Sequence, residues 1–145
     1  MENTKLEPTG LRRIDPIILA YVAGYFDGEG CVSAYIVKKG SLISSLSMSN
    51  CYPGILNQLR GFWGGGVYTP KRRKGFRTEH QWRVTGENSR QMARDILPYL
   101  VEKRRQVQLF LYLYETKPRS AARQLLVDEI KALKHINYDD LTHRR

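Results

Sequence analysis

The sequence lacks most features that mark secreted, membrane-spanning or metal-stabilised proteins. It has two cysteines, Cys31 and Cys51, and three scattered histidines, with none at the spacing of a zinc site. A disulfide framework, a structural zinc and a nuclease of the His-metal type are therefore not indicated, and we expect both cysteines to be small core residues. No run approaches the roughly 20 apolar residues needed to cross a bilayer, and the N-terminus lacks the apolar segment of a signal peptide. We expect no membrane partner and a cytoplasm-like compartment (bacterial, phage-encoded or organellar), without secretion.

Acidic residues are also scarce. The chain has 14 Asp and Glu against 24 Lys and Arg, a formal net charge of +10. No acidic residue lies between Cys31 and Thr78, a segment that contains eight cations. Such a basic chain is expected to meet a polyanion, namely DNA, RNA or an anionic membrane surface, and composition alone leaves these three open.

The length and the apolar content indicate one folded domain. The chain has 145 residues, of which 41% are hydrophobic, enough for a single compact core. We expect a flexible N-terminal arm over residues 1–14, a core over 15–115, and a C-terminal helix and tail over 116–145 that pack on this core.

Proline, glycine and apolar spacing divide the chain into an α+β pattern. Asp15-Pro16 is typical of a helix start, because an N-cap acceptor is followed by a proline whose missing N–H costs nothing there. The order α-β-β-α-β-β-α, with an extra C-terminal helix, predicts an antiparallel four-stranded sheet that has helices on one face. We expect helices at 17–26, 53–62, 88 or 89 to 97, 101 or 102 onward, and 118–134, and hairpins at 31–48 and 67–85.

The second face of this sheet is expected to be polar and basic. Side chains alternate along a strand, so the face opposite the core presents groups that bond to phosphates and base edges, and a two-stranded ribbon fits the DNA major groove. A merely solvated surface is the alternative. The candidate DNA-binding residues are Lys38, Lys39, Lys71, Arg72, Arg73, Lys74, Arg77, Gln81 and Arg83.

The first helix carries the strongest indication of function. Ala20, Ala23 and Gly24 form a stripe of small side chains, which lets two helices approach closely, so we expect a second copy of this helix as the partner. Asp27 and Glu29 follow where the paired helices end. Closely placed carboxylates favour a shared divalent cation, and hard oxygen ligands suit Mg²⁺, or Mn²⁺. Such ions can activate water toward a phosphodiester.

Two segments resemble a known family. Residues 22–30, VAGYFDGEG, resemble the motif of the LAGLIDADG homing endonucleases, with Glu29 in place of the second Asp. Residues 98–106, PYLVEKRRQ, resemble the family's Pro-x-Leu-x-x-Lys-x-x-Gln segment. The resemblance covers about residues 15–115 and includes the predicted order of elements. Only one copy of the motif is present, which in this family implies a homodimer.

The resemblance implies a site-specific endonuclease that cuts both strands of double-stranded DNA across the minor groove and leaves short 3′ overhangs. It implies that Glu29 is catalytic and binds the metal together with the Gly28 carbonyl, that Asp27 caps the partner's helix, and that Lys103 polarises the attacking water or the scissile phosphate. A polar residue at the end of the second strand, Asn50 or Ser49, is expected to join the site. Alternatives are a cleavage-inactive DNA-binding regulator, an RNA-splicing maturase, or a non-specific protein that coats nucleic acid.

Overall fold

The computed structural model describes residues 4–6, 12–71 and 74–135, and it has the predicted order of elements. The helices are α1 (Pro16–Glu29), α2 (Pro53–Trp63), α3 (Gly86–Ile96), α4 (Arg104–Tyr112) and α5 (Ala121–Leu133), with short 3-10 turns η1 (Leu97–Tyr99) and η2 (Leu113–Glu115). The strands are β1 (Thr4–Leu6), β2 (Arg12–Ile14), β3 (Gly30–Ile36), β4 (Leu42–Asn50), β5 (Gly66–Tyr68) and β6 (His80–Val84).

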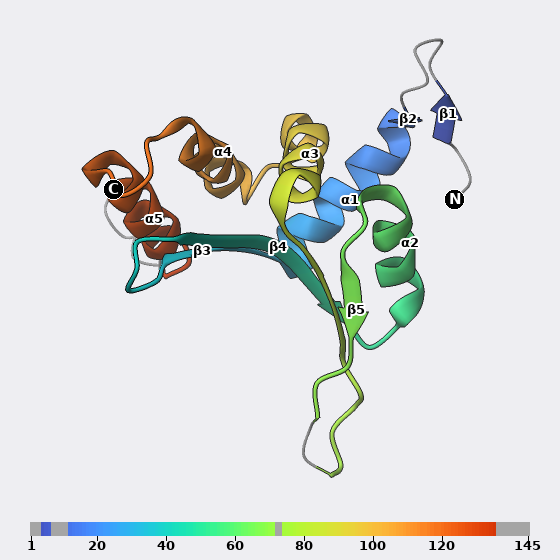
Figure 1. Ribbon diagram of the computed structural model, residues 1–145. Coiled ribbons are helices and arrows are strands. Elements are labelled where there is room, and N and C mark those ends of the chain that lie inside the picture. Colours follow the sequence, from blue (N-terminus) through green and yellow to red (C-terminus); the bar gives the residue numbers. More distant parts are fainter. Residues whose placement is uncertain (1–3, 7–11, 72–73, 136–145) are drawn as a thin grey trace, which may run out of the picture.

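The main sheet is antiparallel in the order β3-β4-β6-β5, and the helices cover one of its faces (Figure 1). This confirms the predicted α+β fold class. The β3–β4 hairpin and the β5–β6 hairpin extend in different directions, so the sheet is strongly bent and its uncovered side is concave (Figure 1). No helix within the described ranges is both long and apolar enough to span a membrane.

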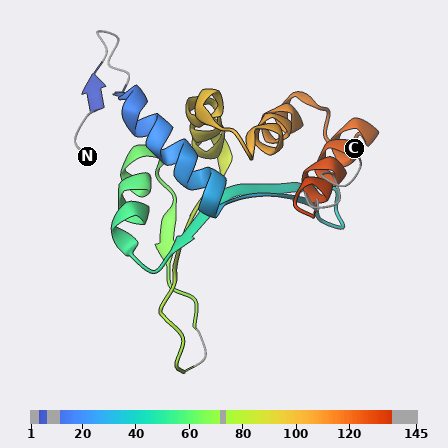
Figure 2. The same ribbon diagram turned by 180° about the vertical axis from the view of Figure 1, so that it is seen from behind.

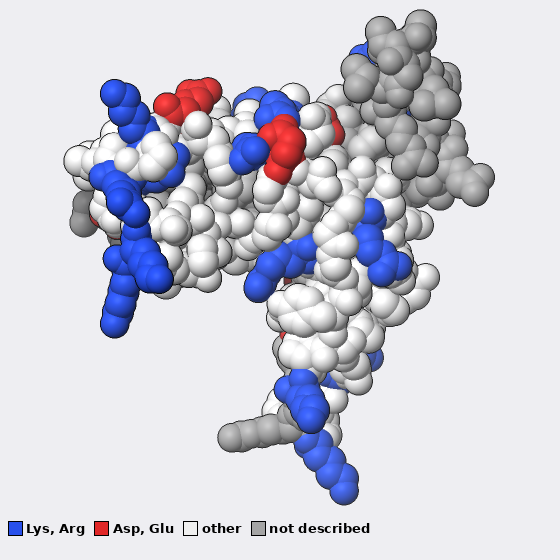
Figure 3. Space-filling model, viewed as in Figure 1, with Lys and Arg blue, Asp and Glu red and all other residues white. Residues whose placement is uncertain are grey.

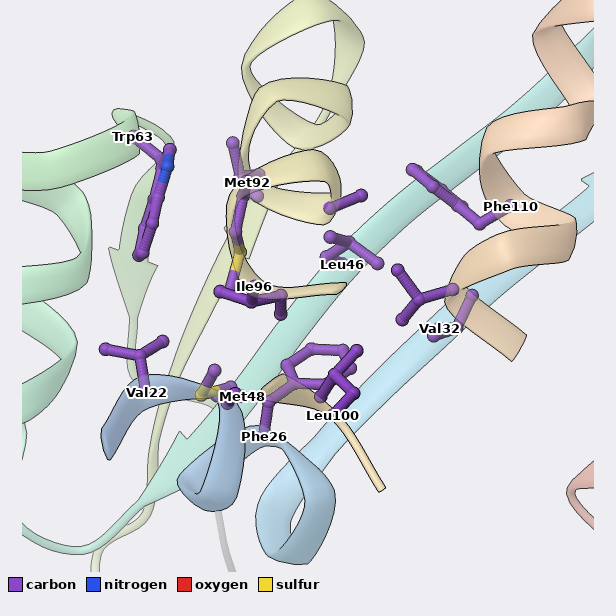
Figure 4. Packing of buried hydrophobic residues seen from close by; sticks show 14 of the residues in the cluster. Val22, Phe26, Val32, Leu46, Met48, Trp63, Met92, Ile96, Leu100 and Phe110 are labelled. Carbon is purple, nitrogen blue, oxygen red and sulfur yellow. The ribbon is translucent and has the colours of Figure 1, made fainter. Parts of the chain in front are cut away.

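The core lies between the sheet and the helices. Alternate residues of β3 and β4, such as Val32, Leu46 and Met48, point toward the helices and are buried. Figure 4 shows them against Phe26 of α1 and Ile96 of α3. These apolar contacts hold the ends of α1 and β4 in fixed positions beside each other.

Helix α1 begins and ends as local sequence chemistry requires. The Asp15 carboxylate accepts a hydrogen bond from the backbone N–H of Ile17 at 2.8 Å, which confirms the predicted N-cap. The helix continues through Glu29, three residues beyond the predicted end at Phe26. Gly30 then has an extended backbone, so no left-handed turn requires a glycine there. The glycine is needed because a Cβ at this position would lie 2.4 Å from the Phe26 ring.

Other boundaries also differ from the sequence expectation: β4 continues to Asn50, and β6 starts at His80. Helix α3 starts at Gly86, and Ser89 does not cap it but donates its hydroxyl to the Gly86 carbonyl at 2.6 Å. Strand β5 ends at Tyr68, just before Pro70, which has no N–H for the sheet. The predicted helix that opens at Pro118 starts instead at Ala121, with Ser120 as its N-cap.

The structure adds two strands to the predicted N-terminal arm and corrects the expectation about the cysteines. Strands β1 and β2 pair antiparallel within the predicted N-terminal arm, whose flexibility stays a prediction. Cys31 and Cys51 are exposed, so the expectation of core cysteines is wrong. Cys31 points to the uncovered side of β3, and Cys51 lies in the turn between β4 and α2.

The close approach at Gly30 gives a stability prediction. We expect Gly30→Ala to lower the free energy of unfolding by about 1–3 kcal/mol, because the Phe26 ring is fully buried and cannot yield. Gly61→Ala in α2 is the matched control, because a Cβ there meets nothing within 4 Å; it should gain up to about 1 kcal/mol from helix propensity. Chemical denaturation measures both, and equal stabilities would contradict this account of Gly30.

Candidate active site and nucleic-acid interface

The carboxylate of Asp27 joins the end of α1 to the start of α4. Its two oxygens accept the backbone N–H groups of Val101 and Lys103, each at 2.9 Å. These bonds hold residues 101–103 outside the helix, which explains why α4 starts at Arg104 and not at the predicted position 101 or 102. Within its own chain Asp27 therefore acts as a cap for this segment. Its capping of a partner's helix stays a prediction.

Lys103 lies at the same place. Its ammonium group donates to the backbone carbonyl oxygen of Asp27, in the last turn of α1. A cation at this end of a helix is favourable, because the last carbonyls lack partners and carry the negative end of the helix dipole. The structure thus brings Lys103 to the acidic end of α1, and the ammonium retains two further N–H donors.

Glu29 is the last residue of α1, and its side chain is exposed. It makes no hydrogen bond or ion pair with any of the described residues, whereas Asp27 is engaged. The described ranges contain no group of three or more His, Cys, Asp or Glu side chains that could hold a metal ion. One chain therefore offers a single free carboxylate at this position.

Asn50 lies at the end of β4 on the side of α1, and both of its polar atoms are used. Its amide nitrogen donates to the hydroxyl oxygen of Tyr25, and its carbonyl oxygen accepts the backbone N–H of Tyr52 at 2.9 Å. Ser49, the alternative, lies on the opposite side of the strand and pairs in register with Gln81. The structure thus gives Asn50 a local structural role, and its catalytic role stays a prediction.

Tyr25 is a residue that the sequence analysis missed. Burial is the first cause that raises the pKa of its hydroxyl, and the negative charge of Glu29 also raises it, against the lowering effect of the Asn50 hydrogen bond. Tyr25 therefore stays neutral over the physiological range and lies within electrostatic reach of Glu29. The spacing of Tyr21, Tyr25 and Glu29, four residues apart on one helix, is the signal that could have revealed this group.

The outward face of α1 differs from the predicted stripe. Ala23 is fully buried in the core of its own chain, so its assignment to the outward stripe is wrong. Ile17 is 81% exposed and Tyr21 56% exposed, and a Cβ added at Gly24 would meet nothing within 4 Å. Seen from behind, α1 lies in front of the sheet, and none of the described helices and strands covers it (Figure 2). The exposed stripe consists of Ile17, Ala20, Tyr21, Gly24 and Gly28.

The uncovered face of the sheet is polar. The register places its side chains in rows across the strands: Cys31, Ser47 and Arg83 in one row, and Ser49, Gln81 and Tyr68 in the next. The Tyr68 hydroxyl donates to the Gln81 side chain, and the Arg83 guanidinium lies 5.8 Å from the centre of the Tyr68 ring. These contacts fix the directions of the predicted Gln81 and Arg83 without consuming all of their donors.

Basic residues lie at the two ends of this face. Lys38 and Lys39 are exposed in the turn between β3 and β4, while Lys71, Lys74 and Arg77 are exposed in the loop between β5 and β6. In Figure 3 blue atoms gather on the left, over α5 and the β3–β4 turn, and again on the loop at the bottom, while most of the visible acidic atoms lie over the helices. The predicted Arg72 and Arg73 fall outside the described residues. The face therefore combines a polar centre with cationic ends, a pattern suited to a long polyanion.

Solved structures of homing endonucleases resemble this one. Homing endonuclease I-CvuI, in complex with its target in the presence of calcium, matches with a TM-score of 0.68 and 27% identity over 84% of this chain and 85% of that chain. I-CvuI with the I-CreI target and magnesium, where the DNA is not cleaved, gives 0.66 and 26% over 83% and 84%. The LAGLIDADG homing endonuclease I-GzeII, in complex with its DNA target, gives 0.58 and 16% over 90% of this chain and 50% of that chain.

No protein-family model matches the sequence, and no curated protein matches it. The structural matches nevertheless confirm the resemblance found in residues 22–30 and 98–106: the chain has the LAGLIDADG homing-endonuclease fold.

The link through Asp27 gives the second prediction. We expect Asp27→Ala to reduce the free energy of unfolding by about 1–2 kcal/mol, because two backbone N–H groups lose their acceptor. Asp128→Ala is the control: Asp128 is exposed and accepts only from Gln124 on its own helix, so a change within about 0.5 kcal/mol is expected. If urea denaturation gave both variants the same midpoint, the capping role of Asp27 would be wrong.

Proposed function

We propose that this chain, with its LAGLIDADG homing-endonuclease fold, is a site-specific endonuclease that cuts both strands of DNA as a homodimer with a divalent metal ion. One observation carries the proposal: the exposed Glu29 carboxylate ends a helix whose last turn also binds the Lys103 ammonium, through the Asp27 carbonyl, and whose outward face is exposed. The remaining features of the molecule supply a surface for DNA and a surface for a second copy.

The concave sheet face is the DNA-binding surface in this proposal. Hydroxyl, amide and guanidinium groups of Ser47, Gln81 and Arg83 can contact base edges, because a two-stranded ribbon enters the major groove. Exposed cations at both ends, Lys38 and Lys39 in one turn and Lys71, Lys74 and Arg77 in the loop between β5 and β6, can neutralise phosphates on the flanks of a long target. The I-CvuI structures, whose fold is similar, are complexes with DNA.

The outward face of α1 is the proposed dimer interface. Residues 16–26 contain no charged side chain, so the helix is apolar on the face that its own core leaves bare. The absence of a Cβ at Gly24 and Gly28 allows a second α1 to approach closely. A two-fold axis along this contact would bring the Glu29 carboxylates of both copies together, which supplies the second acid that one chain lacks.

The metal site would use oxygen ligands at the end of α1. The exposed Glu29 carboxylate and the Gly28 carbonyl are hard donors of the kind that Mg²⁺ or Mn²⁺ prefers, so the residues present fit such an ion. When bound there, the ion would activate a water molecule and stabilise the leaving oxygen of the phosphodiester, with the cuts in the two strands lying across the minor groove from each other.

Lys103 is the proposed cationic partner of this acid. Its bond to the Asp27 carbonyl orients the ammonium, and its two other N–H donors can face the scissile phosphate or the attacking water. Asp27 fixes the backbone of Lys103 at the same time. In this proposal the joint at Asp27 brings together an acid from the end of α1 and a cation from the segment before α4, and the cation would polarise the attacking water or the scissile phosphate.

The charge of Glu29 provides the central test. We expect Glu29→Gln to bind duplex DNA as the wild type does but to cut at least about 1,000-fold more slowly, because the neutral amide is a poor metal ligand. Cleavage of a randomised duplex library with Mg²⁺, with and without EDTA, measures activity, and filter binding measures affinity. Glu115→Gln, an exposed acid in η2, is the control and should cut normally. Wild-type binding without any metal-dependent cleavage would indicate a regulator or a maturase instead.

Gly24 tests the dimer. Because a Cβ at this position meets none of the described residues within 4 Å, Gly24→Leu should leave the fold intact and yet give monomers at micromolar concentration in sedimentation experiments. Ala122→Leu, on the exposed side of α5, is the control and should remain dimeric. A Gly24→Leu protein that sediments as the wild-type dimer would place the interface elsewhere.

A further inference from the structure

The connection between α4 and α5 has an unusual backbone at Arg119. Its φ is +60°, and no other non-glycine residue in the described part of the chain has a positive φ. This conformation costs roughly 1–2 kcal/mol for a residue with a Cβ, so the surrounding structure must hold it in place. Pro118 precedes it, and Ser120 follows as the N-cap of α5.

The side chain of Arg119 crosses to the turn between β3 and β4. Its Nη2 donates to the carbonyl oxygen of Lys39 at 2.9 Å. Gly40, the next residue, has a φ of +80°, and a Cβ there would come within 2.8 Å of the Arg119 Nε and 2.9 Å of its Cγ. Two conformationally special residues, 79 positions apart, therefore meet in one contact.

The base of this contact is rigid. Arg123, in the first turn of α5, is 91% buried and donates to the carbonyls of Leu113 and Thr116 at 3.1 and 2.8 Å. Val127 and Ile130 of the same helix are fully buried in the core. Arg119 thus lies directly before the N-cap of an anchored helix.

The tip of the contact belongs to the proposed DNA-binding surface. The turn is closed by the bond from Val37 N–H to the Ser41 carbonyl at 3.0 Å and by that from Gly40 N–H to the Val37 carbonyl at 2.7 Å. Lys38 and Lys39 are exposed there, at the far end of the hairpin beside α5 (Figures 1 and 3). A hairpin tip without such a lateral contact would be held only by its own two strands.

We infer that Arg119 is a positioning residue for DNA specificity: it fixes the turn at 38–41, and thereby sets base preference in the outer part of the target. This inference rests on the proposed function. The strand from Cys31 to Lys38 spans about 23 Å at roughly 3.3 Å per residue. This length corresponds to about seven base-pair steps of roughly 3.4 Å. The turn therefore acts about seven base pairs outward from the residues beside Glu29.

A positioning role and a direct phosphate contact by Arg119 would affect binding in different ways. A phosphate contact contributes affinity evenly across sequences, whereas a displaced turn loses base discrimination only at the positions that it faces. The effect of Arg119 must consequently be measured position by position along the target, and the charge that is removed must be controlled.

Arg119→Gly is the test variant, because glycine accepts the positive φ without strain and removes only the side chain. We expect its base discrimination, measured by selection from a randomised target library, to fall at least about five-fold at the outer positions and to stay unchanged at the central ones. Amide hydrogen exchange without DNA should become faster at residues 38–41 and not in β4. Lys117→Ala removes one charge from the same exposed connection, and it should leave the profile of base preference unchanged.

The proposed function and the positioning role of Arg119 are contradicted by different results. A wild-type protein that selects no sequence would contradict the proposed function itself. A wild type that selects a target, together with an Arg119→Gly profile identical to it, would overturn the positioning role. Uniform weakening at all positions by both Arg119→Gly and Lys117→Ala, with unchanged exchange in the turn, would also overturn it and identify Arg119 as a phosphate contact.

Discussion

The carboxylate of Asp27 is the interaction on which the arrangement of the site depends. It binds two backbone N–H groups that lie 74 and 76 positions later in the chain, and so fixes where the segment before α4 meets the end of α1. Glu29 and Lys103 flank this joint, one on each segment. The bonds from the Asp27 carboxylate therefore fix the backbones of these two segments relative to each other, and each functional side chain starts from a fixed position.

The same helix serves two surfaces at once. Its inner face, with Val22, Ala23 and Phe26, is fully buried in the core, and its outer face is bare over Ile17, Tyr21 and Gly24. Since the inner contacts fix the rotation of α1, they also decide which of its residues are exposed. A substitution in the core could thus disturb the outer face without touching it, because closely packed interiors transmit small shifts.

Local chemistry made much of this fold predictable, and long-range contacts account for what was missed. The Asp15-Pro16 start of α1 and the β3–β4 hairpin depend on neighbouring residues, so the sequence indicates them directly. Ala23 was assigned to the wrong face because a helix that is apolar all round gives no signal of its rotation. The roles of Asn50 and Arg119 depend on Tyr25 and Lys39, partners that no periodicity connects to them.

Ion pairs within the helix layer offset part of the positive charge on that side of the molecule. Glu87 is bound by Arg94 and Arg90, whose hydrogen bonds lower the pKa of its carboxyl, and Glu129 is bound by Arg105 at 3.0 Å. These pairs neutralise cations on the side of the sheet that the core covers. Lys38, Lys39, Lys71, Lys74 and Arg77 are exposed at the two ends of the concave face and add positive charge there. At physiological salt such charge is screened over about 8 Å, so it acts on a polyanion only close to the surface.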